Sequence, residues 1–162
     1  MIVLVMGVAG AGKTTVGNLL ARELGWTFAD ADSYHSPENV KKMASGIPLT
    51  DEDRKDWLDR LRELIQSWEA SGENAVLACS ALKDAYRRKL VISSNVKLVF
   101  LRGEFGLIRG RMMLRPGHYM NPDLLHSQFE TLEEPSVAEA VVADVSAPPE
   151  ELVRSIRAAL RV

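Results

Sequence analysis

Residues 7–14 read Gly7-Val8-Ala9-Gly10-Ala11-Gly12-Lys13-Thr14, and they match the pattern G-x-x-x-x-G-K-[ST]. The apolar run 2–6 comes directly before them, and a segment with helical spacing follows. Positions without side chains let backbone N–H groups converge on phosphate oxygens, and the helix that begins near Lys13 directs the positive end of its dipole at the same point. The stretch therefore predicts a strand, a phosphate-binding loop and a helix, and with them nucleotide binding.

The residue types in this loop indicate which atoms would bind ATP and magnesium. Lys13 places a positive charge beside the phosphates, and the hydroxyl of Thr14 is an oxygen ligand of the kind that Mg²⁺ takes next to a nucleotide. A glycine-rich turn that serves packing alone is the alternative interpretation. We expect ATP and Mg²⁺ as cofactors, and the ATP-binding residues predicted from the loop are Gly7, Gly10, Ala11, Gly12, Lys13, Thr14 and Thr15.

The rest of the chain alternates short apolar runs with segments of helical periodicity. Buried strands are predicted for the apolar runs 2–6, 27–29, 75–79, 98–101 and 140–143. Strands that alternate with helices imply βαβ units and a parallel sheet covered on both faces, with ligands beyond the carboxyl ends of the strands. We predict a single α/β domain over residues 1–162, built on a five-stranded parallel sheet.

Capping residues mark the ends of the predicted helices. Gly25 and Gly72 each follow an apolar helical stripe, where a glycine C-cap is expected. Thr50-Asp51-Glu52-Asp53 resembles a capping box, and Asn121-Pro122 places a cap residue and then proline at the start of a later helix. The run 141–144 comes late in the chain, and we interpret it as an edge strand that ends near the nucleotide base.

The composition excludes several classes of protein. The 162 residues carry 20 Lys and Arg against 22 Asp and Glu, a net charge of -2 that lacks the basic excess typical of nucleic-acid binding. No apolar run approaches the roughly 20 residues of a membrane span. The single cysteine, Cys79, rules out an internal disulfide, and its apolar surroundings favour packing over nucleophilic chemistry. We expect a soluble, cytoplasmic protein with no nucleic-acid or membrane partner.

Two carboxylates at the end of the second predicted strand are candidates for the chemistry. Motor and switch NTPases usually place an acid after a central apolar strand, whereas Ser80 follows the run 75–79 here. Asp30 and Asp32 stand two residues apart and can project towards the phosphate loop, one near Mg²⁺ and the other near an acceptor hydroxyl. This arrangement favours a kinase for a small alcohol. The alternative is that both aspartates only cap the loop or the next helix.

Several separated segments form a further pattern along nearly the whole chain. They are Asp30-Ala31-Asp32-Ser33-Tyr34-His35, Asn39-Val40-Lys41-Lys42-Met43, the run 46–54 with Trp57-Leu58, Cys79-Ser80-Ala81-Leu82-Lys83 with Tyr86-Arg87, the run 115–120, and the run 127–133. With the phosphate loop, they resemble the gluconokinase (gluconate kinase) family of small P-loop kinases. Tyr119 stands where phenylalanine is commoner and Pro116 where a basic residue is frequent, which bears on the stiffness of a lid.

The resemblance implies a fold, an activity and an assembly. The fold is a three-layer P-loop kinase with the nucleoside-kinase type of core and a mobile helical lid. The activity is the ATP-dependent phosphorylation of D-gluconate to 6-phospho-D-gluconate, with Mg²⁺. Family members commonly form homodimers, so a homodimer is expected here.

Gluconate is an anionic polyol, so its site needs a cation for the carboxylate and short polar groups for the hydroxyls. We predict that Asp32 contacts the primary hydroxyl that becomes phosphorylated. The surrounding substrate-binding residues are predicted to be His35, Lys42, Arg54, Ser80, Lys83, Arg87 and Gln128. Asn39 and Lys42 could instead form a solvated helix face. The three histidines are too scattered to indicate a zinc site, so the metal ligands expected are Thr14 and, as a second candidate, Asp30.

Three arginines form the predicted lid, which spans about residues 109–125. Arg109, Arg111 and Arg115 are expected on one helix, where Arg111 and Arg115, four residues apart, share a face. In small kinases of this architecture such arginines close over ATP, so Arg115 would neutralise the moving phosphoryl group and Arg111 would lie nearer the base. A basic surface stripe is the alternative. The predicted catalytic residues are Lys13, Asp32 and Arg115.

Three other functions remain open from the sequence. A shikimate-type or other small-metabolite kinase shares the phosphate loop and the Asp-x-Asp pattern, although the Asp-Arg-x-x-Trp-Leu and Cys-Ser-Ala-Leu-Lys segments favour gluconate. A nucleoside monophosphate kinase fits less well. A noncatalytic nucleotide switch is disfavoured because the acid after the run 75–79 is missing.

Overall fold

The computed structural model describes residues 1–115 and 123–162, and all strands in these two ranges belong to one parallel sheet. The strands are β1 (Ile2–Met6), β2 (Thr27–Asp30), β3 (Ala75–Ala78), β4 (Val96–Arg102) and β5 (Ala140–Asp144). The helices are α1 (Lys13–Leu24), α2 (Pro37–Ala44), α3 (Asp51–Ser71), α4 (Asp84–Leu90), α5 (Phe105–Met113), α6 (Leu124–Thr131) and α7 (Pro149–Leu160), with a short 3-10 helix at Ala31–Tyr34. The predicted five-stranded parallel α/β architecture is confirmed.

The strand that leads into the phosphate loop lies at the centre of the sheet. The strand order is β2-β3-β1-β4-β5, and Leu4 of β1 stands in register with Leu77 of β3 on one side and Leu98 of β4 on the other. All strands end at the same edge because all are parallel. The loop after β1 therefore lies in the middle of the carboxyl edge, which is where ligands bind in open α/β sheets.

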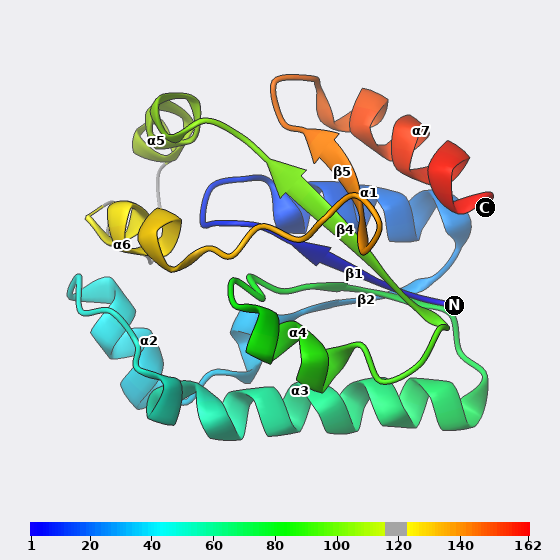
Figure 1. Cartoon of the computed structure of the whole chain (residues 1–162), viewed down its shortest axis with the longest axis horizontal. Helices are drawn as coiled ribbons and strands as arrows, with labels where there is room; N and C mark the ends of the chain where they lie inside the picture. The colour runs from blue at the N-terminus through cyan, green and yellow to red at the C-terminus, as the bar shows by residue number, and fades with distance from the viewer. Residues whose placement is uncertain (116–122) are drawn as a thin grey trace.

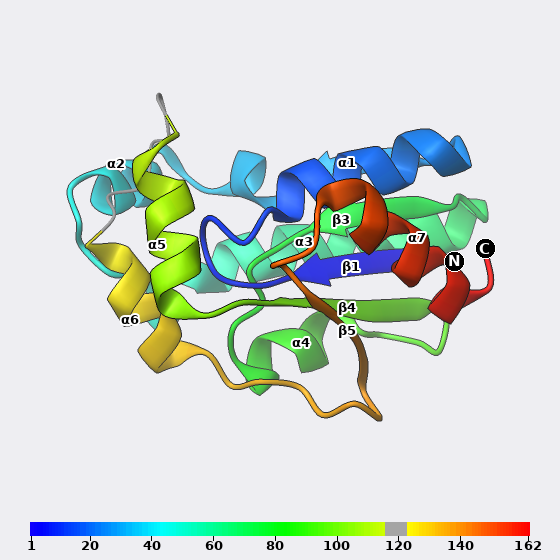
Figure 2. The same cartoon turned by 90° about the horizontal axis from the view of Figure 1, so that it is seen from above.

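Helices cover both faces of this sheet, as Figures 1 and 2 show. α1 and α7 pack on one face, and α3 and α4 pack on the other. Successive side chains of a strand point to opposite faces, so β1 contributes to both cores. Val3 and Val5 join the apolar cluster under α1 and α7, and Leu4 and Met6 join the cluster against α3. Burial on both faces explains why β1 reads as an unbroken apolar run.

The predicted ends of α1 and α3 are confirmed. Gly25 is the C-cap of α1 and Gly72 is the C-cap of α3, both in the left-handed region at φ 68° and 70°, which favours glycine. α3 begins with a complete capping box, in which Thr50 Oγ1 accepts from the backbone N–H of Asp53 and the Asp53 carboxylate accepts from that of Thr50. The cap predicted at Asn121-Pro122 lies outside the described residues.

Two of the five predicted buried strands are only partly buried. β2 and β5 are the edges of the sheet, and most of their residues are half-buried or exposed. An edge strand lacks a neighbour on one side, and Val142 of β5 keeps 37% of its surface exposed. The interpretation of 141–144 as an edge strand is confirmed, whereas the expectation of full burial at 27–29 and 140–143 is wrong.

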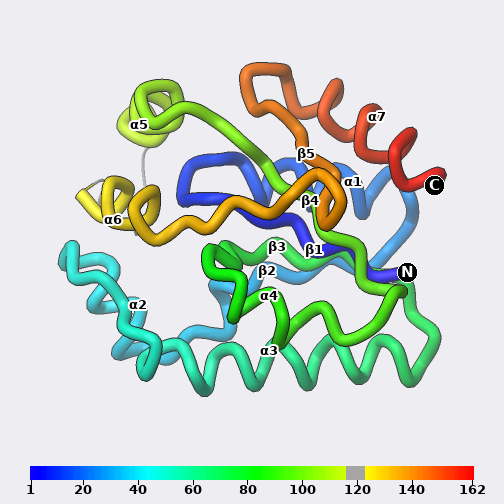
Figure 3. Tube along the Cα trace, viewed as in Figure 1, coloured from blue at the N-terminus to red at the C-terminus, as the bar shows by residue number. Residues whose placement is uncertain are grey.

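Three short helices gather at the carboxyl edge of the sheet. α2, α5 and α6 lie at this end of the molecule, and both termini lie at the opposite end (Figure 3). Arg109 and Arg111 are on α5 as expected, but α5 ends at Met113, so Arg115 follows the helix and is not part of it. A proline disfavours the helical conformation of the residue before it, and Arg115 comes directly before Pro116. This accounts for the end of α5 before Arg115. Of the predicted lid, residues 116–122 lie outside the described part of the chain.

Within the described ranges, no helix is long and apolar enough to cross a membrane.

Candidate active site

The phosphate loop has the backbone conformation that its glycines permit. Gly10 and Gly12 take φ values of 77° and 96°, in the left-handed region that residues with a Cβ rarely adopt. Gly12 is the N-cap of α1, and no described side chain caps this helix. The first backbone N–H groups of α1 and the positive end of its dipole therefore face the carboxyl edge, where a phosphate can accept from them.

Lys13 and Thr14 direct their polar atoms into the same region. The ammonium of Lys13 donates to the carbonyl oxygen of Val8 at 2.9 Å, within its own loop. Burial lowers the pKa of Lys13, while the nearby carboxylates of Asp32 and Asp30 act in the opposite direction. A half-buried cation next to carboxylates and the N-terminus of a helix is a strong binding element for an anionic polyphosphate.

Asp30 connects the loop to the end of β2. Its Oδ2 accepts from the hydroxyl of Thr14 at 2.6 Å, and its Oδ1 accepts from the backbone N–H of Asp32 at 2.9 Å. The alternative interpretation, that Asp30 caps the following 3-10 helix, is therefore correct for its Oδ1. Its Oδ2 and the Thr14 hydroxyl form a pair of hard oxygen atoms that fits Mg²⁺ shared with nucleotide phosphates. The described residues contain no group of three or more His, Cys, Asp or Glu side chains suited to a metal ion.

A cavity of about 60 Å³ begins at the phosphate loop and continues towards α2 and α3. Of the predicted catalytic, metal and substrate-binding residues, those that line it are Lys13, Thr14, Asp32, His35, Arg54, Ser80, Arg115 and Gln128. Met43 and Leu49, which were not predicted as site residues from the sequence, add an apolar part to the wall. Residues from six separate segments thus meet beside the phosphate loop.

His35 is held flat against Trp57 in this cavity. The two rings stack at 4.2 Å between centroids with an interplanar angle of 11°, and Trp57 is itself fixed because its Nε1 donates to the carbonyl oxygen of Ala31 at 2.7 Å. Burial, with a smaller effect of Arg54, lowers the pKa of His35 to about 4. The imidazole is therefore neutral at physiological pH, and its buried Nδ1 has no hydrogen-bond partner among the described residues.

Gln128 joins the cavity wall formed by α6 to the phosphate loop. It lies on α6, and its Oε1 accepts from the backbone N–H of Ala9 at 2.7 Å. The two residues are separated by 119 positions in the sequence. This bond holds α6 against the loop, so the wall of the cavity and the nucleotide-binding segment are directly connected.

Three predicted substrate-binding residues do not line this cavity. The ammonium of Lys42 pairs with Asp53 at 3.0 Å, and that of Lys83 pairs with Asp51 at 2.9 Å. Arg87 is buried and donates to the backbone carbonyls of residues 81 and 82 on its own loop. Each cation is therefore engaged elsewhere, and the group that the structure brings together is smaller than the predicted shell. The alternative of a solvated face at Asn39 does not hold either, because Asn39 is buried and donates to a backbone carbonyl.

A second cavity, of about 450 Å³, opens on the other side of the phosphate loop. Thr15, Arg111 and Arg115 line it together with the glycines of the loop. Arg111 donates to the carbonyl oxygen of Val145 at 2.6 Å, so α5 is tied to the segment after β5. That Arg111 lies nearer the nucleotide base stays a prediction.

The far wall of this second cavity comes from the segment between β5 and α7. Val145, Ala147 and Pro148 line it, and none of them was in the predicted nucleotide-binding set. The signal that could have identified them is their place directly after a strand that ends at the carboxyl edge. Parallel strands deliver their following loops to one edge, and here the segment after β5 lines the same cavity as the phosphate loop.

Cys79 is structural, as expected. It is buried at the end of β3, and burial raises the pKa of its thiol to about 12. The thiol is therefore protonated at physiological pH and is a poor nucleophile.

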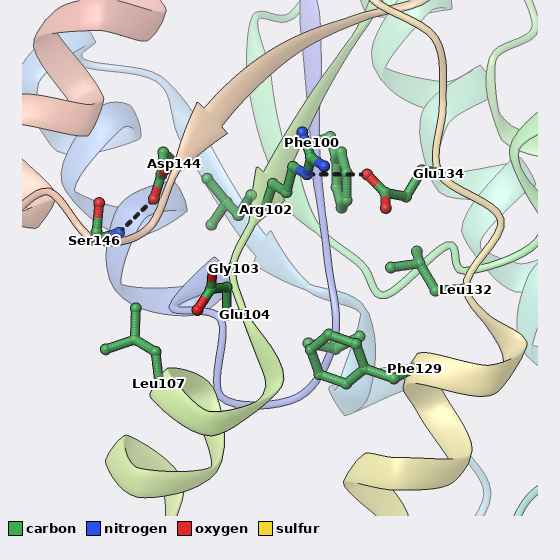
Figure 4. Close-up of a pocket in the computed structure, with 12 residues that line it drawn as sticks. Phe100, Arg102, Gly103, Glu104, Leu107, Phe129, Leu132, Glu134, Asp144 and Ser146 are labelled. Atoms are coloured by element: carbon green, nitrogen blue, oxygen red, sulfur yellow. Dashed lines mark hydrogen bonds and ion pairs between the residues drawn. The ribbon is translucent and has the colours of Figure 1, made fainter.

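A third cavity, of about 560 Å³, lies beside the ends of β4 and β5 and contains none of the predicted site residues (Figure 4). Its floor is apolar, with Phe100 and Phe129, and three of its four charged side chains have partners. Arg102 pairs with Glu134 at 3.2 Å, and Asp144 accepts from the backbone N–H of Ser146 at 2.9 Å (Figure 4).

A phosphate loop on the central strand of a parallel sheet, facing a cavity with an aspartate and two arginines, defines a P-loop kinase of the shikimate kinase type. In agreement, the family model described as shikimate kinase matches residues 9–161. The protein is thus a phosphotransferase that uses ATP.

Comparison with known proteins narrows this class to one family. The mouse (Mus musculus) protein named "Probable gluconokinase" is 44% identical, over 99% of this chain and 97% of its own length. The "Thermoresistant gluconokinase" of Escherichia coli K12 is 39% identical, over 95% of this chain and 90% of its own. The crystal structure of a gluconokinase from Sinorhizobium meliloti 1021 superposes with a TM-score of 0.86 at 44% identity, covering 98% of this chain and 90% of that one. The chain belongs to the gluconokinase family.

Proposed function

We propose that this protein transfers the γ-phosphoryl group of ATP to the primary hydroxyl of D-gluconate and forms 6-phospho-D-gluconate and ADP. The observation that carries the proposal is the cavity that Asp32 and Arg54 share with Lys13 of the phosphate loop. Asp32 suits the hydroxyl, Arg54 suits the carboxylate, and Lys13 suits the transferred group. Membership of the gluconokinase family supports the same acceptor.

In the proposed reaction, the hydroxyl oxygen at C6 of gluconate attacks the γ-phosphorus of ATP. The new P–O bond forms as the bond from phosphorus to the β–γ bridging oxygen breaks, and the hydroxyl proton passes to the carboxylate of Asp32. Lys13 and Arg115 neutralise the negative charge on the transferred group. Charge neutralisation of this kind is worth ~10³ to 10⁵ in rate, whereas a general base contributes ~10² to 10⁴, so the two cations should dominate.

The proposal includes Mg²⁺ as the metal partner of ATP. Thr14 and Asp30 would hold it, since their oxygen atoms already lie 2.6 Å apart beside the loop. When bound, Mg²⁺ supplies positive charge to the phosphate oxygens. The residues Gly7, Gly10, Ala11, Gly12 and Thr15 complete the proposed nucleotide site, with Arg111 on the side of the base.

We also propose a cytoplasmic homodimer. A single buried cysteine is compatible with a reducing compartment, which supports the location. Exposed apolar side chains on and after α5, among them Phe105, Leu107 and Met113, support self-association. Light scattering of the purified protein at several concentrations measures the oligomeric state, and a monomer at all concentrations would overturn this part.

The acceptor is tested by measuring ADP release from MgATP with a panel of compounds. The panel contains D-gluconate, shikimate, AMP and no acceptor, and ³¹P NMR of the product identifies the phosphorylated position. Release that depends on gluconate, with a phosphomonoester at C6, supports the proposal. Release with shikimate would instead favour the second candidate, which the shikimate kinase family model suggests, and binding of ATP without acceptor-dependent turnover would favour a nucleotide switch.

A further inference from the structure

A chain of polar side chains runs from the surface of the molecule to the acceptor cavity. The ammonium of Lys83 pairs with Asp51 Oδ1 at 2.9 Å, and the Tyr86 hydroxyl donates to the same oxygen. Arg54, which lines the cavity, donates from Nη1 to the Tyr86 hydroxyl at 3.2 Å. Asp51 and Arg54 lie in the first turn of α3, and Tyr86 comes from α4, so the chain joins two helices.

Arg54 is held through one end of its guanidinium group. Nη1 donates both to Tyr86 and to the carbonyl oxygen of Leu49, the latter at 2.9 Å, and the guanidinium carbon lies 5.5 Å from the centre of the Tyr86 ring. Among the described residues, Nε and Nη2 have no hydrogen-bond partner. Nε and Nη2 form one edge of the planar guanidinium group, and this edge can donate two parallel hydrogen bonds to a carboxylate.

The donor and the acceptor of each hydrogen bond between Lys83, Asp51, Tyr86 and Arg54 are defined. Hydrogen bonds from Tyr86 and Lys83 lower the pKa of Asp51, so its carboxylate stays ionised. Burial and the bond to Asp51 raise the pKa of Tyr86, so its hydroxyl stays protonated. Because the Tyr86 hydroxyl donates its proton to Asp51, its oxygen can only accept from Arg54. Tyr86 is buried, so the ring cannot move away without a change in packing.

We propose that Tyr86 is a positioning residue that orients Arg54 for the carboxylate of the acceptor, and that Asp51 and Lys83 fix Tyr86 in turn. The inference rests on the proposed function, because it assigns the carboxylate of gluconate to Arg54. It also gives Lys83 an indirect role in place of the predicted contact with substrate. Selection of a sugar acid over a neutral polyol then depends on a phenol that does not itself touch the substrate.

Tyr86→Phe tests this proposal because it removes the hydroxyl and keeps the ring. Loss of a hydrogen bond to a charged group corresponds to a roughly tenfold effect. We expect the KM for gluconate to rise about tenfold, while kcat and the KM for ATP stay within about twofold of the wild type. Tyr34→Phe is the control, because it removes the hydroxyl of a partly buried tyrosine outside the chain of contacts to Arg54, and its constants should equal those of the wild type.

A second variant covers the case in which Tyr86→Phe does not fold. Asp51→Asn weakens the acceptor for Tyr86 at an exposed position, and it should raise the KM for gluconate about threefold with kcat retained. Glu52→Gln removes one negative charge from the same helical turn and serves as its control. A KM for gluconate that is unchanged in both test variants, or a parallel loss in kcat and both KM values, would refute the positioning role. Absence of gluconate-dependent turnover in the wild type would instead refute the proposed function.

Discussion

Asp32 is the residue that accepts the hydroxyl proton in the proposed reaction. It lies in the 3-10 helix after β2, in the cavity that also contains Lys13, and its backbone N–H is held by Asp30. Asp30 thereby orients Asp32 through the backbone while its other oxygen contacts Thr14. In the proposed reaction, the two carboxylates, two residues apart, therefore have different tasks, one beside the hydroxyl proposed to hold Mg²⁺ and one beside the acceptor.

Asp32→Asn should separate these tasks. An amide cannot take the hydroxyl proton, so kcat should fall by ~10² to 10⁴. ATP binding should be retained, since the phosphate loop is intact, and calorimetry should give a Kd within about twofold of the wild type. Asp59→Asn, at an exposed position of α3, is the control and should leave kcat unchanged. A near-normal kcat for Asp32→Asn would eliminate Asp32 as the base.

His35 should make stability depend on pH in a defined window. Its pKa is about 4 in the folded protein and 6.5 ordinarily, so between these values the unfolded chain binds a proton that the folded chain does not. The free energy of unfolding is therefore fully present above pH 6.5 and falls as the pH drops towards 4. Because the ring is partly exposed, we expect a loss of about 1 kcal/mol between pH 6.5 and pH 5.

Urea unfolding of the wild type and of His35→Gln, at both pH values, measures this contribution. Glutamine does not titrate, so the variant should lose less stability on acidification than the wild type. Equal losses in the two proteins would show that His35 is not the group responsible.

The residue types of the site could be predicted from the sequence, but their partners could not. Lys13, Thr14 and Asp30 follow from the loop pattern and from the end of a strand. Arg87 was expected near the substrate because its segment fits the family, yet it bonds to carbonyls only five and six residues earlier. That choice depends on how the loop before α4 turns, which is not encoded in the spacing of side chains.

At the scale of elements, the beginning of α3 positions the residues that we propose for the carboxylate of the acceptor. Its capping box fixes the first turn, and that turn carries both Asp51 and Arg54. The box could be predicted because its residues are consecutive in sequence. The bounds of the strands were predicted to within about two residues, and the polar end of β4 at Arg102 was missed because an apolar run was the signal used to identify that strand.

Thr50→Ala should destabilise this helix end. The substitution removes the side-chain oxygen that accepts from Asp53, and loss of such a cap costs about 1 kcal/mol of unfolding free energy. Thr50→Ser keeps the hydroxyl and is the control. Denaturant unfolding of the three proteins is the measurement, and equal midpoints for alanine and serine would show that the cap contributes nothing.

At the scale of the whole molecule, the sheet divides two apolar cores, and β1 is the strand that contributes to both. Alternation of helices and strands was enough to predict this layered architecture. The order of the strands was not, because it depends on which parallel neighbours pair. The partial exposure of β2 and β5 follows from that order, which is why the sequence did not reveal it.

Core and edge positions should therefore respond differently to truncation. Leu4 is fully buried at the centre of the sheet, so Leu4→Ala should lower the free energy of unfolding by about 3 kcal/mol. Val142→Ala, on the edge strand, should cost less than about 1 kcal/mol. Urea unfolding with a shared slope checks both values, and a cost at Val142 equal to that at Leu4 would contradict the edge assignment.

The bond between Gln128 and Ala9 limits how this enzyme could diverge. A substitution at position 128 that suits a new acceptor also removes the hydrogen bond to Ala9 of the phosphate loop. It would therefore affect ATP binding with every acceptor. The side of the cavity formed by Met43 and Leu49 has no such bond to the loop among the described contacts. New acceptor preferences are therefore expected to evolve on that side, by substitutions that leave the handling of ATP untouched.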